Sequence, residues 1–207
     1  MDRSDLPFIR LDQIARKLDG ETTSWFKKAA KSGRVEDRPA CSRGCAACCH
    51  QLVPLTTLEA QRIANFLTDL PRPTKRQLVK DVDRQVQKFG KWVKDRPQGD
   101  IQNAEVNRDY LAQHIGCAFL GPENECRIYP VRPIICRGHH ALESNIPCQK
   151  ADQPIRTIPG LDLATREAVI ETRKLTASLG TVTQGGLMTT FAALFRAALT
   201  GRLPESG

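Results

Sequence analysis

Apolar residues recur at intervals of three and four along most of the chain, whereas alternation of apolar and polar positions is scarce. Such spacing is typical of amphipathic helices. The pattern begins with Leu11 and Leu18, and we expect a first helix that ends at Gly20. A second short helix is expected over 23–31, followed by an irregular stretch over 33–44. The pattern therefore predicts a mainly helical fold.

Two further helices are predicted in the middle of the chain. Thr56, followed three residues later by Glu59, forms a capping box that marks a helix start, and Pro71 and Pro73 are expected to stop that helix. A basic helix should follow from about Thr74. Its apolar residues form one stripe and indicate that it docks against the rest of the protein: Leu78, Val82, Val86, Phe89 and Val93.

The later part of the chain supplies the one β element that we expect. Segments 117–120 and 125–129 flank a turn-forming stretch and are predicted to pair as a small hairpin. Helices are expected over 101–114, 162–179 and 187–200. The expected fold is therefore mainly α with a small β-hairpin, a helical scaffold around a Cys-rich metal-binding centre. We divide it into an N-terminal helical segment (1–40), a Cys-rich domain (41–150) and a C-terminal helical extension packing on it (151–207).

Eight cysteines in 207 residues change this picture most. A chain of this length can bury a core without disulfide staples. The charged N-terminus leads into no apolar run of the kind a secretory signal needs, and no apolar stretch is long enough to span a membrane. We therefore expect a cytoplasmic protein whose thiols are reduced and serve as metal ligands. The predicted ligands are Cys41, Cys45, Cys48, Cys49, Cys117, Cys126, Cys136 and Cys148.

Thiolates are soft ligands that suit zinc and iron-sulfur clusters, and four of them complete either a tetrahedral zinc site or a 4Fe-4S cluster. We favour the cluster, because structural zinc sites usually show paired Cys-x2-Cys knuckles and this chain has one tight group plus dispersed cysteines. A structural zinc protein that binds a protein or nucleic acid, and a protein that stores or delivers metal, are the alternatives. Taken singly, Cys117 and Cys136 could also be small buried apolar residues.

The adjacent thiols of Cys48 and Cys49 are expected to diverge, so that one of them serves a second site or a supporting role. Cys41, Cys45 and Cys48 also have the spacing of the radical S-adenosylmethionine motif. That chemistry would need a strand before the motif and alternating strands and helices after it, which the pattern does not predict. No catalytic residue is assigned, and whether the protein is an enzyme stays open.

Histidines and arginines lie near the cysteines in the sequence. His50, His139 and His140 could complete a mixed zinc site, although supporting or surface positions are favoured for them, and His114 is a weaker candidate. Three arginines recur at intervals of five, and guanidinium groups would stabilise a negatively charged cluster of thiolates. The alternative is that they form surface ion pairs with glutamates. The arginines are Arg127, Arg132 and Arg137, and the glutamates are Glu123, Glu125 and Glu143.

The formal net charge of +8 is concentrated in one segment. Residues 72–96 carry nine Lys or Arg against three Asp, an excess of six positive charges. A solvated helix face is the favoured explanation. Nucleic-acid binding through this basic helix is the alternative, although no aromatic residues alternate with the basic ones to stack on bases.

Several short motifs stand out in the cysteine-rich part of the chain. They are Gly44-Cys45-Ala-Ala-Cys48-Cys49, Leu55-Thr56 with Glu59, Cys117-Ala-Phe-Leu120, Cys126-Arg-Ile-Tyr129, Arg132-Pro133 and Cys136-Arg137. Together they resemble the bacterial cysteine-cluster (CxxCxxCC) family of zinc- or iron-chelating proteins, whose relatives include the flagellin lysine N-methylases. The resemblance spans about residues 41–148 and implies that all eight cysteines bind metal. The methylase likeness implies modification of protein side chains with S-adenosylmethionine, but no Gly-rich nucleotide loop supports this.

Overall fold

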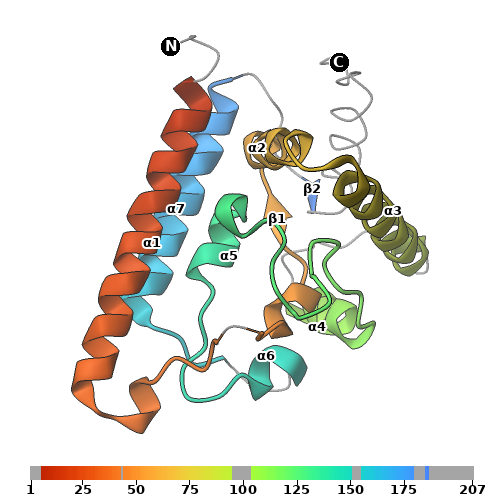
Figure 1. Cartoon of the computed structure of the whole chain (residues 1–207). Helices are drawn as coiled ribbons and strands as arrows, with labels where there is room; N and C mark the ends of the chain where they lie inside the picture. Colours follow the sequence, from red (N-terminus) through yellow and green to blue (C-terminus); the bar gives the residue numbers. More distant parts are fainter. Residues whose placement is uncertain (1–5, 43, 95–103, 151–154, 180–184, 187–207) are drawn as a thin grey trace.

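A computed structural model describes residues 6–42, 44–94, 104–150, 155–179 and 185–186 (Figure 1). Helices dominate these ranges, which confirms the expected mainly helical fold. Two long helices lie along one side of the molecule and a second pair of helices lies across from them, with a less regular region between. The helix expected over 187–200 lies outside the described residues. The division of the chain at residues 40 and 150 stays a prediction.

The two long helices are α1 (Leu6–Ser32) and α7 (Pro159–Ala177), which run antiparallel in contact with each other. The prediction that Gly20 ends the first helix is wrong, because α1 continues through it. Gly20 is exposed, and a glycine inside a helix costs only about 1 kcal/mol, which the apolar packing on either side outweighs. The helix ends instead at Gly33, whose φ of 69° is the left-handed conformation of a helix C-cap.

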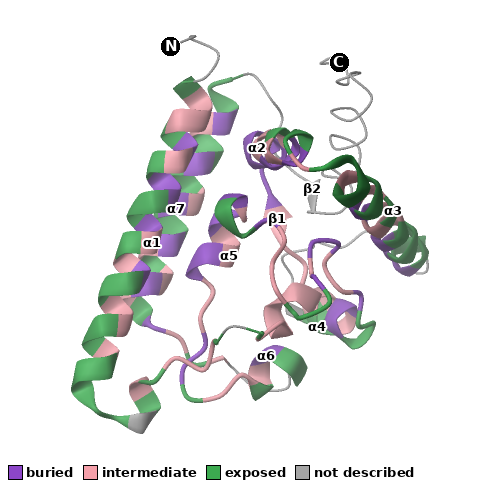
Figure 2. Ribbon diagram, viewed as in Figure 1, coloured by how far each residue is buried: buried purple, intermediate pink, exposed green. Residues whose placement is uncertain are grey.

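The short helix α5 (Ile134–Gly138) packs against both long helices. Leu18 of α1, Ile134 of α5 and Leu161 of α7 are buried in a shared apolar core. Figure 2 shows buried residues along the facing sides of these helices. Gly138 has no room for a side chain because Thr165 of α7 occupies that space, so α5 and α7 approach closely. The α1–α7 pair therefore fixes the position of α5, the helix that carries Cys136.

The helix α2 spans Thr57–Thr68 and begins at the predicted capping box. Glu59 N donates to Thr56 Oγ1 over 3.3 Å, and Thr56 N donates to Glu59 Oε2 over 2.9 Å. The helix ends before Pro71, as expected. Pro73, however, does not separate two helices: it lies in the first turn of the next one, a position that proline tolerates.

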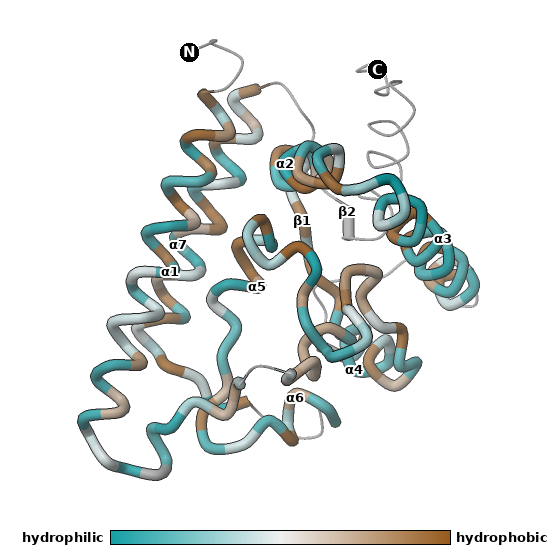
Figure 3. Tube along the Cα trace, in the orientation of Figure 1, coloured by the Kyte–Doolittle hydropathy of each residue, from teal (hydrophilic) through white to brown (hydrophobic). Residues whose placement is uncertain are grey.

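The basic helix α3 spans Arg72–Lys94 and docks by its apolar stripe, as predicted. Leu78 and Val82 are buried in a second core with α2, and Phe89 is buried in a third cluster. The predicted stripe is wrong at its last residue, because Val93 is 41% exposed and the neighbouring Trp92 is buried instead. Figure 3 shows the outer side of α3 as largely hydrophilic.

The remaining elements are short. The strands β1 (Pro54–Leu55) and β2 (Gly185–Gly186) pair antiparallel. The helices α4 (Ala104–Ala112) and α6 (Ile146–Lys150) and the 3-10 turns η2 (Val35–Asp37), η3 (Ala47–His50) and η4 (Tyr129–Val131) complete the described elements.

The predicted hairpin over 117–129 is reduced to a turn closed by a single antiparallel bridge between Leu120 and Cys126. Gly121 N donates to Glu125 O over 2.8 Å, so the chain does reverse where expected. The described residues contain no regular strand on either side of this turn. The chain instead follows a turn after Cys126, where Tyr129 N donates to Cys126 O over 3.1 Å.

Candidate metal centre

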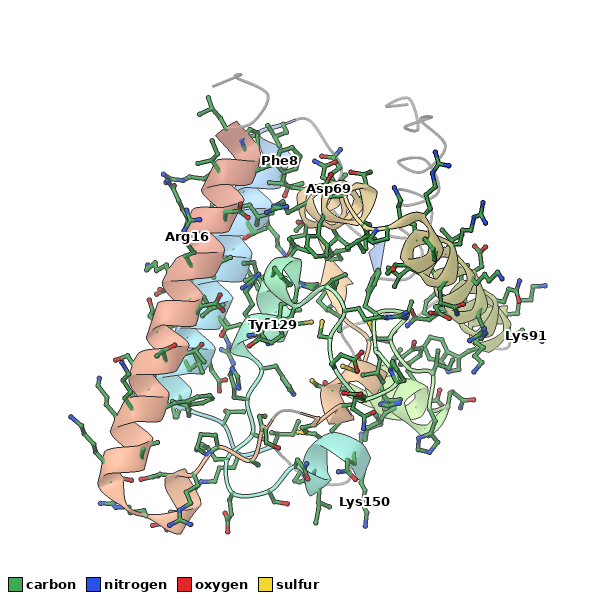
Figure 4. The ribbon with its side chains drawn as sticks, viewed as in Figure 1. Phe8, Arg16, Asp69, Lys91, Tyr129 and Lys150 are labelled. Carbon is green, nitrogen blue, oxygen red and sulfur yellow. The ribbon has the colours of Figure 1, made fainter. Side chains whose placement is uncertain are left out.

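The eight cysteines are free thiols carried mostly by loops and short turns of the region between the two helix pairs. Figure 4 shows sulfur atoms in this middle part of the molecule. Cys48 and Cys49 lie on η3, Cys136 on α5 and Cys148 on α6. The other cysteines lie on the connecting segments. Two neighbourhoods can be distinguished, and they do not follow the order of the cysteines in the sequence.

Cys41, Cys45 and Cys148 make up the first neighbourhood, which we call the loop group. Ala141 N donates to Cys41 Sγ over 3.4 Å, and Asn145 Nδ2 donates to Cys45 Sγ over 3.5 Å. Burial, and after it the nearby thiols, raise the pKa of Cys41 and raise that of Cys148 to about 11. The three thiols therefore lie near enough to one another to interact electrostatically.

Cys117, Cys126 and Cys136 make up the second neighbourhood, which we call the core group. Cys117 and Cys126 pack against the apolar core of α2 and α3. Burial, and after it the neighbouring thiols, raise the pKa of Cys117 to about 11 and that of Cys136 well above its usual value. The backbone amides of Phe119 and Ile128 counteract burial by donating to the thiols of Cys117 and Cys126. Such bonds favour the thiolate, the form that binds metal.

Cys48 and Cys49 lie between the two groups. The expectation that their thiols diverge is wrong, because a hydrogen bond joins them; it lowers the pKa of Cys48 to about 7 and raises that of Cys49. Cys49 is tied to the core group, since Cys117 N donates to Cys49 O over 2.7 Å. Cys48 raises the pKa of Cys148 in one group and of Cys136 in the other. The pair therefore links the two neighbourhoods.

Three arginines hold the core group in place. Arg137 is buried; its Nη1 lies 2.6 Å from Asp19 Oδ2, and its Nη2 donates to Pro130 O over 2.7 Å. Arg132 Nη2 lies 3.9 Å from the other oxygen of Asp19. Arg127 Nη2 lies 2.7 Å from Asp81 Oδ2. The arginines therefore join the cysteine segments to α1 and α3.

The arginines also act on the thiols electrostatically. Arg132 lowers the pKa of Cys48 and of Cys126, and Arg127 lowers that of Cys117. These effects agree with the interpretation that the arginines stabilise thiolates. The alternative of surface ion pairs with glutamates is wrong for these three arginines, because their described ion pairs are with Asp19 and Asp81 of the helices. Of the three glutamates considered, only Glu143 has a described ion pair, with Arg156.

Glu59 has a structural role that the sequence did not reveal. Besides capping α2, its Oε1 accepts a hydrogen bond from Ile134 N over 2.9 Å, at the start of the helix that carries Cys136. The side chain is buried, and burial raises the pKa of its carboxyl group. Glu59 thereby joins the N-terminus of α2 to that of α5. Only the capping half of this role has a local sequence signal.

The rings of His50 and His140 make contacts typical of structural residues. His50 Nδ1 lies 3.2 Å from Ala46 O, and His140 Nε2 lies 2.9 Å from Arg137 O. The ring of His140 also meets that of Phe26 edge to face at 4.8 Å. Burial lowers the pKa of both His139 and His140, which favours their neutral forms. These contacts agree with the supporting role favoured for the histidines.

The thiols are gathered but are not arranged around a metal position. Among the described residues, which include all eight cysteines, no group of three or more His, Cys, Asp or Glu side chains could hold a metal ion as placed. The donor chemistry nevertheless fits a soft metal, because several thiols converge and receive hydrogen bonds at sulfur. Coordination would have to draw the thiols of a group together.

A helical scaffold around a cysteine-rich centre is typical of proteins that bind metal through cysteine thiolates. Residues 40–154 match the CxxCxxCC family, described as a "Putative zinc- or iron-chelating domain". The match covers more than half of the chain, and the protein belongs to this family. In the family's name the first two cysteines are three positions apart, whereas Cys45 follows Cys41 by four and Ser42 occupies the corresponding position.

No curated protein and no solved structure matches the chain. The relation to flagellin lysine N-methylases, and with it a role for S-adenosylmethionine, stays a prediction. Within the described residues, none of the helices combines the length and apolar character needed to cross a membrane.

Proposed function

We propose that the protein binds an iron-sulfur cluster through the core group together with Cys49. The observation that carries the proposal is the convergence of Cys117 and Cys126, from the segment between α4 and η4, with Cys136 of α5 beside a packed apolar core. The hydrogen bond with Cys48 and burial raise the pKa of Cys49 most, and the thiols of Cys117 and Cys126 are near enough to add to the rise. Together the four cysteines supply the four thiolates that a 4Fe-4S cluster requires.

The surroundings of the core group suit such a cluster. Four thiolates carry negative charge, and Arg127 and Arg132 offset part of the rise that burial causes in the pKa of Cys117 and Cys126. The amides of Phe119 and Ile128 would donate to ligand sulfurs, and hydrogen bonds to sulfur tune the potential of a cluster. When bound, the cluster supplies one-electron chemistry. We propose that it serves redox chemistry or the modification of a macromolecule in the cytoplasm, where thiols stay reduced.

The loop group supports a second candidate, a structural zinc site. Cys41, Cys45 and Cys148 with Cys48 would complete a tetrahedral set of four thiolates. The observation that favours zinc here is that single hydrogen bonds from Ala141 and Asn145 hold two of these thiols, so a metal would act as the cross-link. Metal storage or delivery would instead require exchangeable binding, and metal that withstands a chelator would exclude it.

Substitution of the two adjacent cysteines tests both assignments. We expect Cys49→Ser to lose iron, acid-labile sulfide and visible absorption while keeping zinc, and Cys48→Ser to lose zinc while keeping the cluster. The measurement is metal and sulfide analysis of both variants after anaerobic purification. Equal loss of the same metal in both variants would contradict the division into two sites.

A further inference from the structure

A groove of about 280 Å³ lies between α3 and the segment that carries Cys117. Its charged lining consists of Arg84, Lys88 and Arg127 with a single acidic residue, Asp81. This volume is close to the lower end of the range for small-ligand pockets. The groove is open to solvent on one side of the cysteine-rich centre, and the charged residues of its lining carry a net charge of +2.

Two hydrogen bonds fix the walls of the groove relative to each other. Gln85 Oε1 accepts from Ala118 N over 2.7 Å, and Asp81 Oδ2 accepts from Arg127 Nη2 over 2.7 Å. Asp81, Gln85 and Lys88 lie on one face of α3, because residues three and four positions apart are neighbours on a helix. This face is therefore held against the cysteine segment, and the groove exists without a ligand to form it.

The acidic residue offsets only one of the three positive charges of the lining. Both oxygens of Asp81 are engaged, one with Arg127 at 2.7 Å and the other with Arg84 at 3.4 Å. Arg84 is 64% exposed, and Lys88 is exposed one turn further along the helix. Exposed Lys91 extends the positive charge beyond the groove, and Figure 4 shows it at the outer edge of α3.

We propose that this groove binds the phosphate group of a small phosphorylated molecule, held by Arg84 and Lys88. An arginine fork and a lysine point charge are the pair of side chains suited to phosphate oxygens. Leu120 and Pro122 line the groove as well and offer apolar surface to the body of the ligand. Cys117 also lines it, so a ligand bound here would lie beside the core group. The site goes beyond the proposed metal binding and does not depend on it.

The test is calorimetric titration of the full-length protein, purified anaerobically, with a nucleoside monophosphate, inorganic phosphate and acetate at low salt. We expect saturable binding of both phosphate probes and none of acetate. Arg84→Gln with Lys88→Gln should weaken phosphate binding at least about tenfold, since two charge-assisted hydrogen bonds are lost. The control pair, Arg76→Gln with Lys94→Gln, removes the same charge from exposed positions of α3 outside the groove and should weaken it less than about twofold.

A second titration distinguishes binding of a terminal phosphate group, as in a small phosphorylated molecule, from binding of the backbone phosphates of a nucleic acid. A single-stranded oligonucleotide with a 5′-phosphate should bind more tightly than the same strand without it, and the groove substitutions should remove that difference. Equal weakening by both double substitutions, equal binding of acetate, or no saturable binding of phosphate would overturn the proposal. Metal analysis of the same samples reports on the cluster separately, so either proposal can fail alone.

Discussion

The core group and the loop group of thiols are held in different ways. In the core group the amides of Phe119 and Ile128 donate to cysteines only two positions earlier in the chain. In the loop group the donors Ala141 and Asn145 lie 100 residues from the cysteines whose sulfurs they contact. Local turns therefore position the core thiols, whereas the loop thiols depend on closing a long stretch of chain.

The two groups also differ in what supports them. Cys117 and Cys126 pack on the core of α2 and α3, and the helix that carries Cys136 is held by Glu59 and Arg137. In the loop group Cys148 is buried, but Cys41 and Cys45 are only partly buried and lie on segments outside the helices. Closing a long loop costs entropy that a metal cross-link can offset. We infer that the core group is largely formed without metal and that the loop group needs it.

Removing the metal should have the largest of the predicted effects, and it should affect the loop group much more than the core group. With a chelator under anaerobic, reducing conditions, we expect amide exchange of Ala40, which donates to Ala141 O, to accelerate by about a thousandfold, a loss of about 4 kcal/mol of local stability. The amide of Ala118, held by Gln85, should stay protected. Hydrogen exchange measures both. If the amides of Ala40 and Ala118 exchanged faster by the same factor, the distinction between the two groups would be contradicted.

Glu59→Ala should strongly destabilise the protein, because Glu59 supports the helix that carries Cys136 of the core group. The substitution removes the glutamate half of the capping box and leaves the buried amides of Thr56 and Ile134 without their acceptor, at a cost of about 3 kcal/mol. Urea denaturation measures the free energy of unfolding. The control is Glu171→Ala, which removes an exposed ion pair with Arg10 and should cost less than about 0.5 kcal/mol. Similar losses in both variants would show that Glu59 does not connect α2 to α5.

Arg137→Met should cost about 2 kcal/mol, mainly because the carbonyls of Pro130 and Arg132 lose a donor. The ion pair with Asp19 adds little, since that carboxylate is 43% exposed. The same denaturation experiment applies. Arg156→Met, beside the loop group, is the matched control, because its ion pair with Glu143 is exposed and its loss should change stability by less than about 0.5 kcal/mol. A larger loss in the control than in Arg137→Met would reverse the comparison.

Asn145→Ala should weaken metal binding in the loop group about tenfold without unfolding the protein, because residues that hydrogen-bond to metal ligands typically have effects of this size. Competition with a coloured chelator measures the affinity. Gln149→Ala is the control, since Gln149 Nε2 donates to Asn145 Oδ1 and touches the site only through that side chain. Unchanged affinity in Asn145→Ala would mean that its amide does not support the site.

The smallest predicted effect concerns pH. Burial lowers the pKa of His139 in the folded protein, so its contribution to stability is complete above pH 6.5 and is lost as the pH falls through the lowered value. His139→Asn should therefore flatten the fall in unfolding free energy below pH 6.5. His114→Asn is the control, because His114 is exposed and asparagine tolerates its φ of 50°. An unchanged pH slope in His139→Asn would show that the ring does not resist protonation.

The sequence predicted those features that depend on neighbouring residues. The Thr56–Glu59 cap and the docking of α3 by Leu78 and Val82 follow from spacings of three and four residues. The continuation of α1 through Gly20 depends on packing against α7, so the local glycine signal misled. All eight candidate ligands could be named, but their grouping could not, because Cys41 and Cys148 meet across more than 100 residues.

The contact between Glu59 and Ile134 spans 75 residues and likewise has no local signal. The same holds for the groove, whose walls are joined by Gln85 and Ala118. A basic segment was evident in the sequence, but which of its residues face the cysteines was not. Local rules thus predicted elements and residue types, and long-range packing determined how the centre is assembled.

The central claim is that the cysteines bind metal and that the core group holds an iron-sulfur cluster. Quantitative analysis of iron, acid-labile sulfide and zinc in the anaerobically purified wild-type protein tests it most directly. We expect a brown protein with four iron and four sulfide per chain, the composition of one 4Fe-4S cluster, and about one zinc in the loop group. A colourless protein that contains zinc alone would contradict the cluster, and a protein without bound metal would contradict the whole account.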